Sequence, residues 1–296
     1  MNESMRLPLP AAMLRRAREF SGPPAPARAA ATVVLLRPAE PTFEAYVLKR
    51  ATTMAFGGVY AFPGGGVDTS DRPETVRTDW PARLGVPEPE AKAVVGAAAR
   101  ELFEEAGVLL AGPATAAPFG NGGPVGEAGP FGHAGPVGDG GLVEDGGPVG
   151  DGGLVGDVSG PGWEADRAAV LARELTMTEL LTRRGLRLRD DLLFPWSRWI
   201  TPEFEPRRYD TWFFVAALPE SQLARDVSGE SDGTDWISPA ATDGLAMLPP
   251  TVSTLNDLRA YSRISEVLEA SAQRNAADPV MPRIELTDDG AVLHLP

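Results

Sequence analysis

The stretch RELFEEAGV, residues 100–108, gathers three glutamates within one short segment. Glu101, Glu104 and Glu105 are spaced at i, i+3 and i+4, so their carboxylates share one face if the segment is helical. Like charges at this spacing repel by roughly 0.2–0.5 kcal/mol per pair. Such a face becomes favourable when a divalent cation binds it, and carboxylate oxygens suit Mg²⁺ or Mn²⁺ better than zinc. We therefore predict that these glutamates are metal ligands.

Three consecutive glycines, Gly64 to Gly66, precede this acidic segment. Backbone N–H groups in such a run can approach a phosphate because no side chain stands in the way. A plain turn is the alternative interpretation of the glycines, and a solvated helix face is the alternative for the glutamates. Solvated faces usually interleave Lys or Arg at i+4, which favours the metal site.

The composition narrows the chemistry that the chain can perform. There are no cysteines and only two histidines, so thiolate nucleophiles and cysteine-ligated metals are excluded and a Ser-His-Asp triad is disfavoured. The net charge of −14 disfavours nucleic acid and anionic membranes as partners. No apolar run is long enough for a signal peptide or a membrane span, so the expected location is the cytoplasm.

Hydrophobic patterning predicts the elements that must position these residues. An apolar row at Val94, Ala98, Leu102 and Ala106 predicts a helix over 88–109. Runs rich in β-branched and aromatic residues predict strands at 31–38, 43–50, 192–202, 209–218 and 235–238. Further helices are expected at 163–185, 239–245 and 251–273, and a hairpin around Asp289-Gly290 is expected at 283–296. Strands and helices in this order indicate an α+β fold with α/β/α layers.

A glycine-rich tract of six hexapeptides occupies residues 123–158. Each unit offers one or two apolar side chains, which bury too little surface to offset the entropy of ordering the chain. We therefore expect a long flexible insertion over 112–160 rather than a β-helix, with a protein-interaction tether as an alternative role. A second, polar and proline-containing insertion is expected at 69–90.

The acidic segment resembles the Nudix hydrolase superfamily. Residues 100–108 match the core of the Nudix box, RE-U-x-EE-x-G-U, where U is a bulky aliphatic residue, and Phe62-Pro63-Gly64-Gly65 is also similar. The resemblance implies a Nudix-type α/β/α sandwich with a mixed sheet. It also implies Mg²⁺- or Mn²⁺-dependent hydrolysis of a nucleoside diphosphate linked to a group X. By position, Glu101, Glu104 and Glu105 correspond to the metal ligands, and Arg100 to the arginine that orients them.

The downstream segments WSRWITP, 196–202, and RRYDTWFF, 207–214, are similar to the Nudix branch that contains the peroxisomal coenzyme A diphosphatase. This similarity implies coenzyme A or acyl-CoA as substrate. The alternatives are NADH, ADP-ribose, a nucleotide sugar or a dinucleotide polyphosphate. A Nudix-fold module that binds nucleotides without turnover is a further alternative, against which the intact glutamate set argues.

The remaining predictions concern catalysis, substrate contacts and domain limits. Glu104 or Glu105 is the expected general base, with loop residues Glu203 and Glu205 as alternatives, and Arg100 completes the catalytic set. The expected substrate contacts are Gly64, Gly65, Arg50, Arg207 and Arg208, although structural pairing is the alternative for the last two. We expect a lead-in over 1–28, the Nudix domain over 29–265 and a helix end with a hairpin tail over 266–296. The small-molecule diphosphate is the expected partner, and a homodimer is compatible with the sequence.

Overall fold

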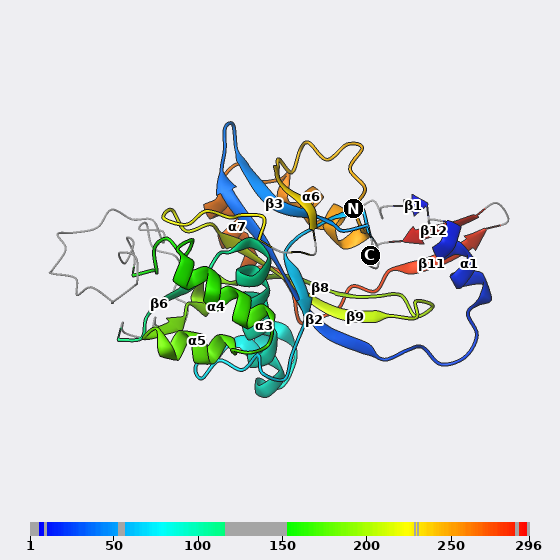
Figure 1. Cartoon of the computed structure of the whole chain (residues 1–296). Coiled ribbons are helices and arrows are strands. Elements are labelled where there is room, and N and C mark those ends of the chain that lie inside the picture. Colours follow the sequence, from blue (N-terminus) through cyan, green and yellow to red (C-terminus); the bar gives the residue numbers. More distant parts are fainter. Residues whose placement is uncertain are drawn as a thin grey trace.

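A seven-stranded mixed sheet forms the centre of the molecule (Figure 1). The structure is a computed structural model, which describes residues 6–8, 11–52, 57–115, 153–227, 229, 231–287 and 290–294. The main strand order is β10-β3-β2-β9-β8, with β4 paired to β3 and β5 paired to β2. The strands of this sheet are β2 (Ala27–Pro38), β3 (Phe43–Arg50), β4 (Tyr60–Ala61), β5 (Gly64–Gly66), β8 (Phe194–Ile200), β9 (Arg208–Ala217) and β10 (Ser231–Ile237).

The central strand β2 is buried on both faces. It runs parallel to β9 and antiparallel to β3 and β5, which makes the sheet mixed as predicted. Val33 and Leu35 belong to one hydrophobic core, whereas Val34 and Leu36 belong to the other. Because side chains alternate along a strand, this continuous apolar run fits a strand covered on both sides.

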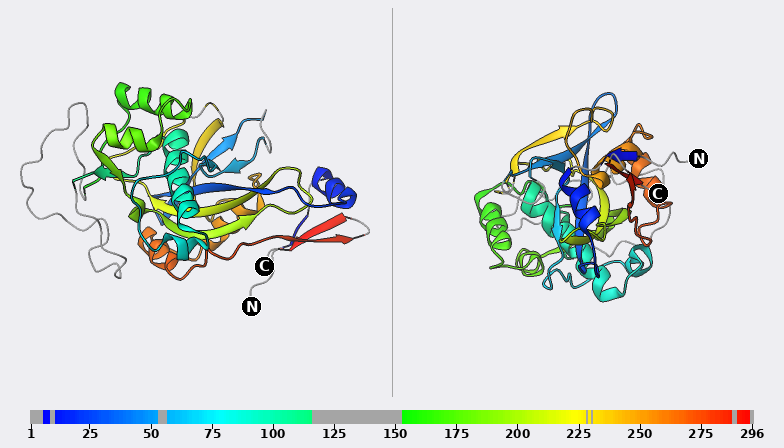
Figure 2. Two further views of the ribbon diagram at one scale, coloured as in Figure 1. Left: turned by 90° about the horizontal axis from the view of Figure 1, so that it is seen from below. Right: turned by 90° about the vertical axis from the view of Figure 1, so that its right-hand side faces the viewer.

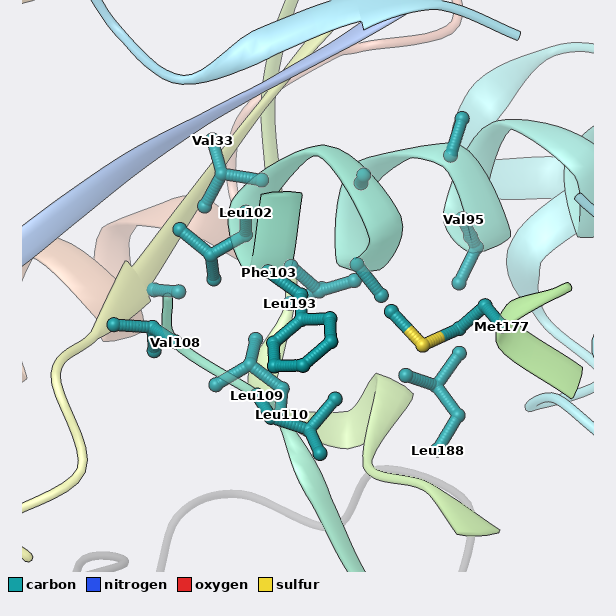
Figure 3. Packing of buried hydrophobic residues seen from close by; sticks show 14 of the residues in the cluster. Val33, Val95, Leu102, Phe103, Val108, Leu109, Leu110, Met177, Leu188 and Leu193 are labelled. Carbon is teal, nitrogen blue, oxygen red and sulfur yellow. The ribbon is translucent and has the colours of Figure 1, made fainter. Parts of the chain in front are cut away.

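Helices cover the two faces of the sheet and give the predicted α/β/α layers (Figures 1 and 2). One face carries α3 (Glu88–Ala106), with α2 (Trp80–Leu84), α4 (Pro161–Leu171) and α5 (Met177–Arg183) around it. The other face carries α6 (Pro249–Leu258) and α7 (Ile264–Ser271). Figure 3 shows Leu102 and Phe103 of α3 packed among Val33, Val108 and Leu109. Within the described residues, no helix has the length and apolar character needed to span a bilayer.

The sequence of α3 explains why this helix can lie inside the protein. Its alanine-rich middle has high helix propensity and lets it approach the sheet closely. The helix ends where Gly107 adopts a left-handed conformation with φ of 65°, and the Gly107 N–H donates to the Phe103 carbonyl at 3.1 Å. The predicted helix over 88–109 is therefore confirmed at its start and ends three residues early.

Two helix predictions in the C-terminal third are wrong. The single helix expected over 251–273 is split into α6 and α7, because the Glu266 carboxylate caps a new helix start by accepting from the backbone N–H groups of Ser262 and Arg263. The helix expected over 239–245 is a pair of turns that includes Gly244 at φ of 78°.

The insertions contribute more ordered structure than expected. Residues 69–90 contain α2, whose Trp80 is fully buried and donates a hydrogen bond to Asp190 at 2.7 Å. At the edges of 112–160, β6 (Ala111–Pro113) pairs with β7 (Leu186–Leu188), and Val158 is 2% exposed in the core. A short 3₁₀ turn, Asp190–Leu192, follows β7. The glycine-rich repeat itself falls within 116–152 except for its last residues, outside the described part of the chain.

The two ends of the chain meet in a small sheet, which the sequence did not predict. The expected hairpin is present as β11 (Arg283–Thr287) and β12 (Gly290–His294), and β12 also pairs with β1 (Arg6–Pro8). Helix α1 (Ala11–Glu19) lies at the same end of the molecule (Figure 2). The expected lead-in therefore holds a strand and a helix.

Gln222 joins the chain after α3 to Val155, in the last hexapeptide of the glycine-rich tract, and its substitution tests this joint. Its side chain is 1% exposed, accepts from the Leu109 N–H at 2.9 Å and donates to the carbonyls of Leu109 and Val155 at 2.9 and 3.0 Å. Gln222→Leu leaves these buried groups unpaired, so we expect the free energy of unfolding in urea to fall by about 3 kcal/mol. Gln273→Leu, at an exposed position, is the control and should change it by less than about 0.5 kcal/mol. Equal losses in the two variants would contradict this role.

Candidate active site

The acidic face of α3 opens into one large cavity. Glu101, Glu104 and Glu105 are 7%, 3% and 7% exposed, and all three line a cavity of about 830 Å³. The shared face predicted from their spacing is present, and it points neither into bulk solvent nor into the hydrophobic core. These carboxylates are therefore close to whatever occupies the cavity.

The glycine strand β5 lies directly against this acidic face. The Gly64 N–H donates to the Glu105 carboxylate at 2.7 Å, and Arg100 donates to the Gly66 carbonyl at 2.8 Å. A Cβ atom on Gly65 would lie 2.5 Å from a Glu101 oxygen, so any side chain there would displace that carboxylate. Close approach therefore requires glycine here. The two parts of the box meet in space although residues 69–87 separate them in sequence.

Arg100 is the cation at the centre of this cluster. Its side chain is 2% exposed and binds both oxygens of Asp71, at 2.7 and 2.9 Å, through a forked geometry. It also donates to Glu101 at 2.7 Å and to Glu104 at 3.0 Å. Burial acts to lower the pKa of Arg100, but the hydrogen bonds and charges of these carboxylates outweigh burial and raise it. Arg100 therefore stays charged and fixes the direction of two of the glutamates.

Arg173 is a second cation at the same face, and it comes from outside the box. It follows α4, lines the cavity and donates to the Glu104 oxygen that Arg100 does not contact. Neither Arg173 nor Asp71 was predicted from the sequence. Both lie in segments without a chemical motif, and only the tertiary fold brings them to α3.

The carboxyl groups of this face have raised pKa values, because they are buried with too little positive charge around them. Burial raises the pKa of Glu101 to about 7 and also raises the pKa of Glu104, against the opposing effect of Arg100. Among the described residues, the guanidinium groups that pair with Asp71, Glu101 and Glu104 are those of Arg100 and Arg173. The acids thus outnumber the bases before Glu105 is counted.

This donor set fits a divalent cation chemically, although its side chains are not arranged around one. In the part of the chain that the structure describes, no group of three or more His, Cys, Asp or Glu side chains is positioned to hold a metal ion. The reason is visible in the contacts: arginine and backbone N–H groups occupy carboxylate oxygens that a metal would need. Excess negative charge on hard oxygen donors is the environment that Mg²⁺ or Mn²⁺ prefers.

The predicted substrate contacts divide into two groups. Gly64, Gly65, Arg50 and Arg207 line the cavity. Within the described residues, the Arg50 Nε has no hydrogen-bond partner. Arg208 is instead 8% exposed and donates to the backbone carbonyls of Thr201 and Ala25, so it holds the start of β9 and is not among the residues that line the cavity. Its surroundings favour the structural alternative for this residue.

The loop after β8 supplies one of the two alternative bases. Glu205 is 3% exposed and lines the cavity, where Arg16 of α1 donates to it at 2.9 Å. Glu203 is exposed and is not among the lining residues. Among the aromatic residues near this loop, Trp199, Tyr209 and Phe213 line the cavity, whereas the core residues Trp196, Trp212 and Phe214 are not among the lining residues.

Part of the cavity wall is apolar and comes from parts of the chain that carry no predicted role. It includes Met13 of α1, Leu171 at the end of α4, and Leu248 with Pro249 at the start of α6. The cavity therefore combines charged side chains with apolar surface, which suits a ligand with polar and apolar parts.

Comparisons with known proteins agree with this geometry. No protein-family model matches the chain. Human acyl-coenzyme A diphosphatase NUDT19 is 26% identical over 307 residues, which cover 86% of this chain and 71% of that protein. A NUDIX hydrolase from Alicyclobacillus acidocaldarius has a TM-score of 0.56 at 24% identity, over 85% of this chain and 98% of the other. The match to the NUDIX domain of Shewanella oneidensis NrtR, in complex with ADP ribose, covers 85% of this chain and 98% of that one, with 10% identity and a TM-score of 0.39.

The sheet and the acidic helix form the predicted Nudix-type fold, and the similarities confirm the predicted resemblance to Nudix hydrolases. The chain also resembles the coenzyme A diphosphatase branch, as predicted. The roles of individual site residues stay predictions.

The raised pKa of Glu101 predicts how the stability of the metal-free protein depends on pH. The pKa of this carboxyl group is near 7 in the folded state and near 4.5 in the unfolded state. Its protonated form therefore stabilises the folded state fully at pH values below 4.5, and this contribution is lost as the pH rises through 7. In Glu101→Gln the side chain stays neutral. With chelator present, we compare the unfolding free energy of the variant with that of the natural chain. We expect the difference to grow in favour of the variant by roughly 3 kcal/mol as the pH is raised from 4.5 to 8. A difference that is constant across this range in urea titrations would contradict the shift.

Proposed function

We propose that this protein hydrolyses the phosphoanhydride bond of coenzyme A or acyl-CoA with the help of Mg²⁺ or Mn²⁺. The observation that carries the proposal is the buried set of three glutamates beside a glycine strand, in a cavity that also has apolar walls. The similarity to human acyl-coenzyme A diphosphatase supports the choice of substrate. The cytoplasmic location stays a prediction from the sequence, with which a homodimer is also compatible.

Glu101, Glu104 and Glu105 would hold the divalent ions. When bound, these ions neutralise charge that develops on the phosphoryl group and lower the pKa of a coordinated water. Arg100 directs the first two carboxylates, and the Gly64 N–H directs the third. These contacts orient the carboxylates before the substrate arrives, and positioning of this kind is a usual source of rate in phosphoryl transfer.

Bond making and breaking are simple in this reaction. The water oxygen forms a bond to one phosphorus, the bond from that phosphorus to the bridging oxygen breaks, and the bridging oxygen leaves with the other phosphate. The water proton passes to a carboxylate, for which Glu104 or Glu105 is the first candidate and Glu205 the alternative on the cavity wall. Coenzyme A would give adenosine 3′,5′-bisphosphate and 4′-phosphopantetheine.

The remaining cavity residues fit the other parts of this substrate. Arg50 and Arg207 offer cationic groups to its phosphates. The apolar wall formed by Met13, Leu171 and Leu248 can contact the pantetheine arm or an acyl chain. Trp199 and Phe213 provide aromatic surface for the adenine ring.

A product screen tests the substrate assignment. The purified full chain is incubated with Mg²⁺ or Mn²⁺ and with coenzyme A, acetyl-CoA, NADH, ADP-ribose or diadenosine polyphosphates, and products are identified by mass spectrometry. We expect coenzyme A to yield adenosine 3′,5′-bisphosphate and 4′-phosphopantetheine. Cleavage of NADH or ADP-ribose with coenzyme A untouched would reject the substrate. Nucleotide binding without any cleavage would reject the enzyme and favour a binding module.

Glu104→Gln tests the catalytic face itself. The substitution keeps the shape of the side chain but removes a charged oxygen, so we expect turnover to fall by at least about 100-fold at saturating Mg²⁺. Glu88→Gln is the matched control, since Glu88 is on the same helix, 67% exposed and paired with Lys92. Near-normal turnover of Glu104→Gln, in steady-state kinetics with the best substrate, would remove Glu104 from the mechanism.

A further inference from the structure

Both oxygens of Glu104 are occupied by guanidinium groups. Arg100 donates to one oxygen at 3.0 Å, and Arg173 donates to the other. Because the carboxylate is 4% exposed, the two arginines supply nearly all the polar contacts that its oxygens have. A cation that binds these oxygens therefore competes with the two arginines for Glu104.

Of these two arginines, Arg173 is the one that can withdraw. The side chain of Arg100 is 2% exposed and is also bound to Asp71, Glu101 and the Gly66 carbonyl. The side chain of Arg173 is 47% exposed and lines the open cavity. Moving Arg100 would break a buried network, whereas moving Arg173 releases one ion pair into a solvent-accessible space.

The backbone at Arg173 is strained, which points to a functional role for this residue. Its φ is 61°, and it is the one residue other than glycine with a positive φ among the described residues. It follows the end of α4, where the Glu174 N–H donates to the Ala169 carbonyl at 2.9 Å, a helix end at which glycine is the usual residue. Strained non-glycine residues of this kind cluster at functional sites.

The strained turn is also held firmly in place. Arg167 of α4 donates to the backbone carbonyl of Glu104 at 3.1 Å, which ties α4 to α3. Arg225 donates to Glu164 at the other end of α4 at 2.6 Å. The backbone of Arg173 is thus anchored beside Glu104, while its side chain has room to reorient.

We propose that Arg173 is an exchangeable counter-ion, which neutralises Glu104 before the metal binds and then turns to contact the substrate diphosphate. When a divalent cation takes the Glu104 oxygen, the guanidinium is displaced into the cavity, where a diphosphate offers it new oxygens in bidentate geometry. The proposal rests on the proposed function for its second half alone. Its first half, competition between Arg173 and a cation, needs no substrate.

Competition and substrate contact predict opposite effects of removing the side chain. Without substrate, Arg173→Gly and Arg173→Gln should bind Mn²⁺ at least about threefold more tightly than the natural chain, because nothing must be displaced from Glu104. With Mn²⁺ saturating, the same variants should bind methylenediphosphonate, a non-hydrolysable diphosphate, at least about fivefold more weakly. A merely structural role would weaken both. Arg173→Lys keeps the charge and should lie between.

The experiment uses calorimetric titration of the full chain, first with Mn²⁺ and then with methylenediphosphonate. The matched control is Arg183→Gln, which removes an equal charge from an exposed side chain that pairs with Asp166 and is not among the residues that line the cavity. Both its affinities should stay within about twofold. Arg173→Gly suits the left-handed backbone, so it keeps the fold while removing the side chain.

Each outcome bears on one of the two proposals. Unchanged or weaker Mn²⁺ binding by the Arg173 variants overturns competition, and unchanged diphosphonate binding overturns substrate contact. The two expected shifts in a protein that cleaves no diphosphate substrate would uphold the role of Arg173 and reject the proposed function. If neither the variants nor the natural chain bind Mn²⁺, both proposals fall.

Discussion

The site depends on the buried guanidinium group of Arg100. It holds Asp71 from the loop before α2, the Gly66 carbonyl of β5, and Glu101 and Glu104 on its own helix. Buried carboxylates are costly unless they are paired, and removing one partner of such a pair typically costs about 3–5 kcal/mol. Arg100 therefore lets an acidic face exist inside the protein and joins the three segments that build it. Its hydrogen bonds tie loop, strand and helix together at this point.

This arrangement explains how the box tolerates an insertion. In a continuous motif the glycines would lead straight into the helix, but here residues 69–87 intervene. The sheet positions the glycines independently of the insertion, because β5 is paired to β2 through Gly64, Gly65 and Gly66. This pairing fixes the place of β5 whatever the length of the inserted segment. The inserted segment then returns through Trp80, which is buried against α3, and through Asp71, which binds Arg100. The insertion supports the site that it interrupts.

The sequence predicted what depends on local spacing and missed what depends on distant contacts. The shared face of the three glutamates follows from helix periodicity, and the layered fold follows from the strand and helix patterns. Asp71, Arg173 and α1 reach the site only through tertiary packing, so no motif marked them. Arg207 lies in the bend before β9 and lines the cavity, whereas Arg208 begins β9 and donates to the backbone of Thr201. Their positions in the sequence did not separate the two, because the strand was predicted to begin after both.

The charges of the site favour a metal-dependent reaction over direct binding of an anion. A diphosphate cannot approach three carboxylates unless cations stand between them, and a chain with a net charge of −14 offers no general attraction. The described arginines that line the cavity, Arg50, Arg173 and Arg207, come from outside the acidic helix, on walls where they can meet phosphate. In the proposed reaction the carboxylates hold the ions and these arginines hold the substrate. The acidic and basic residues that line this cavity then have complementary roles in one reaction.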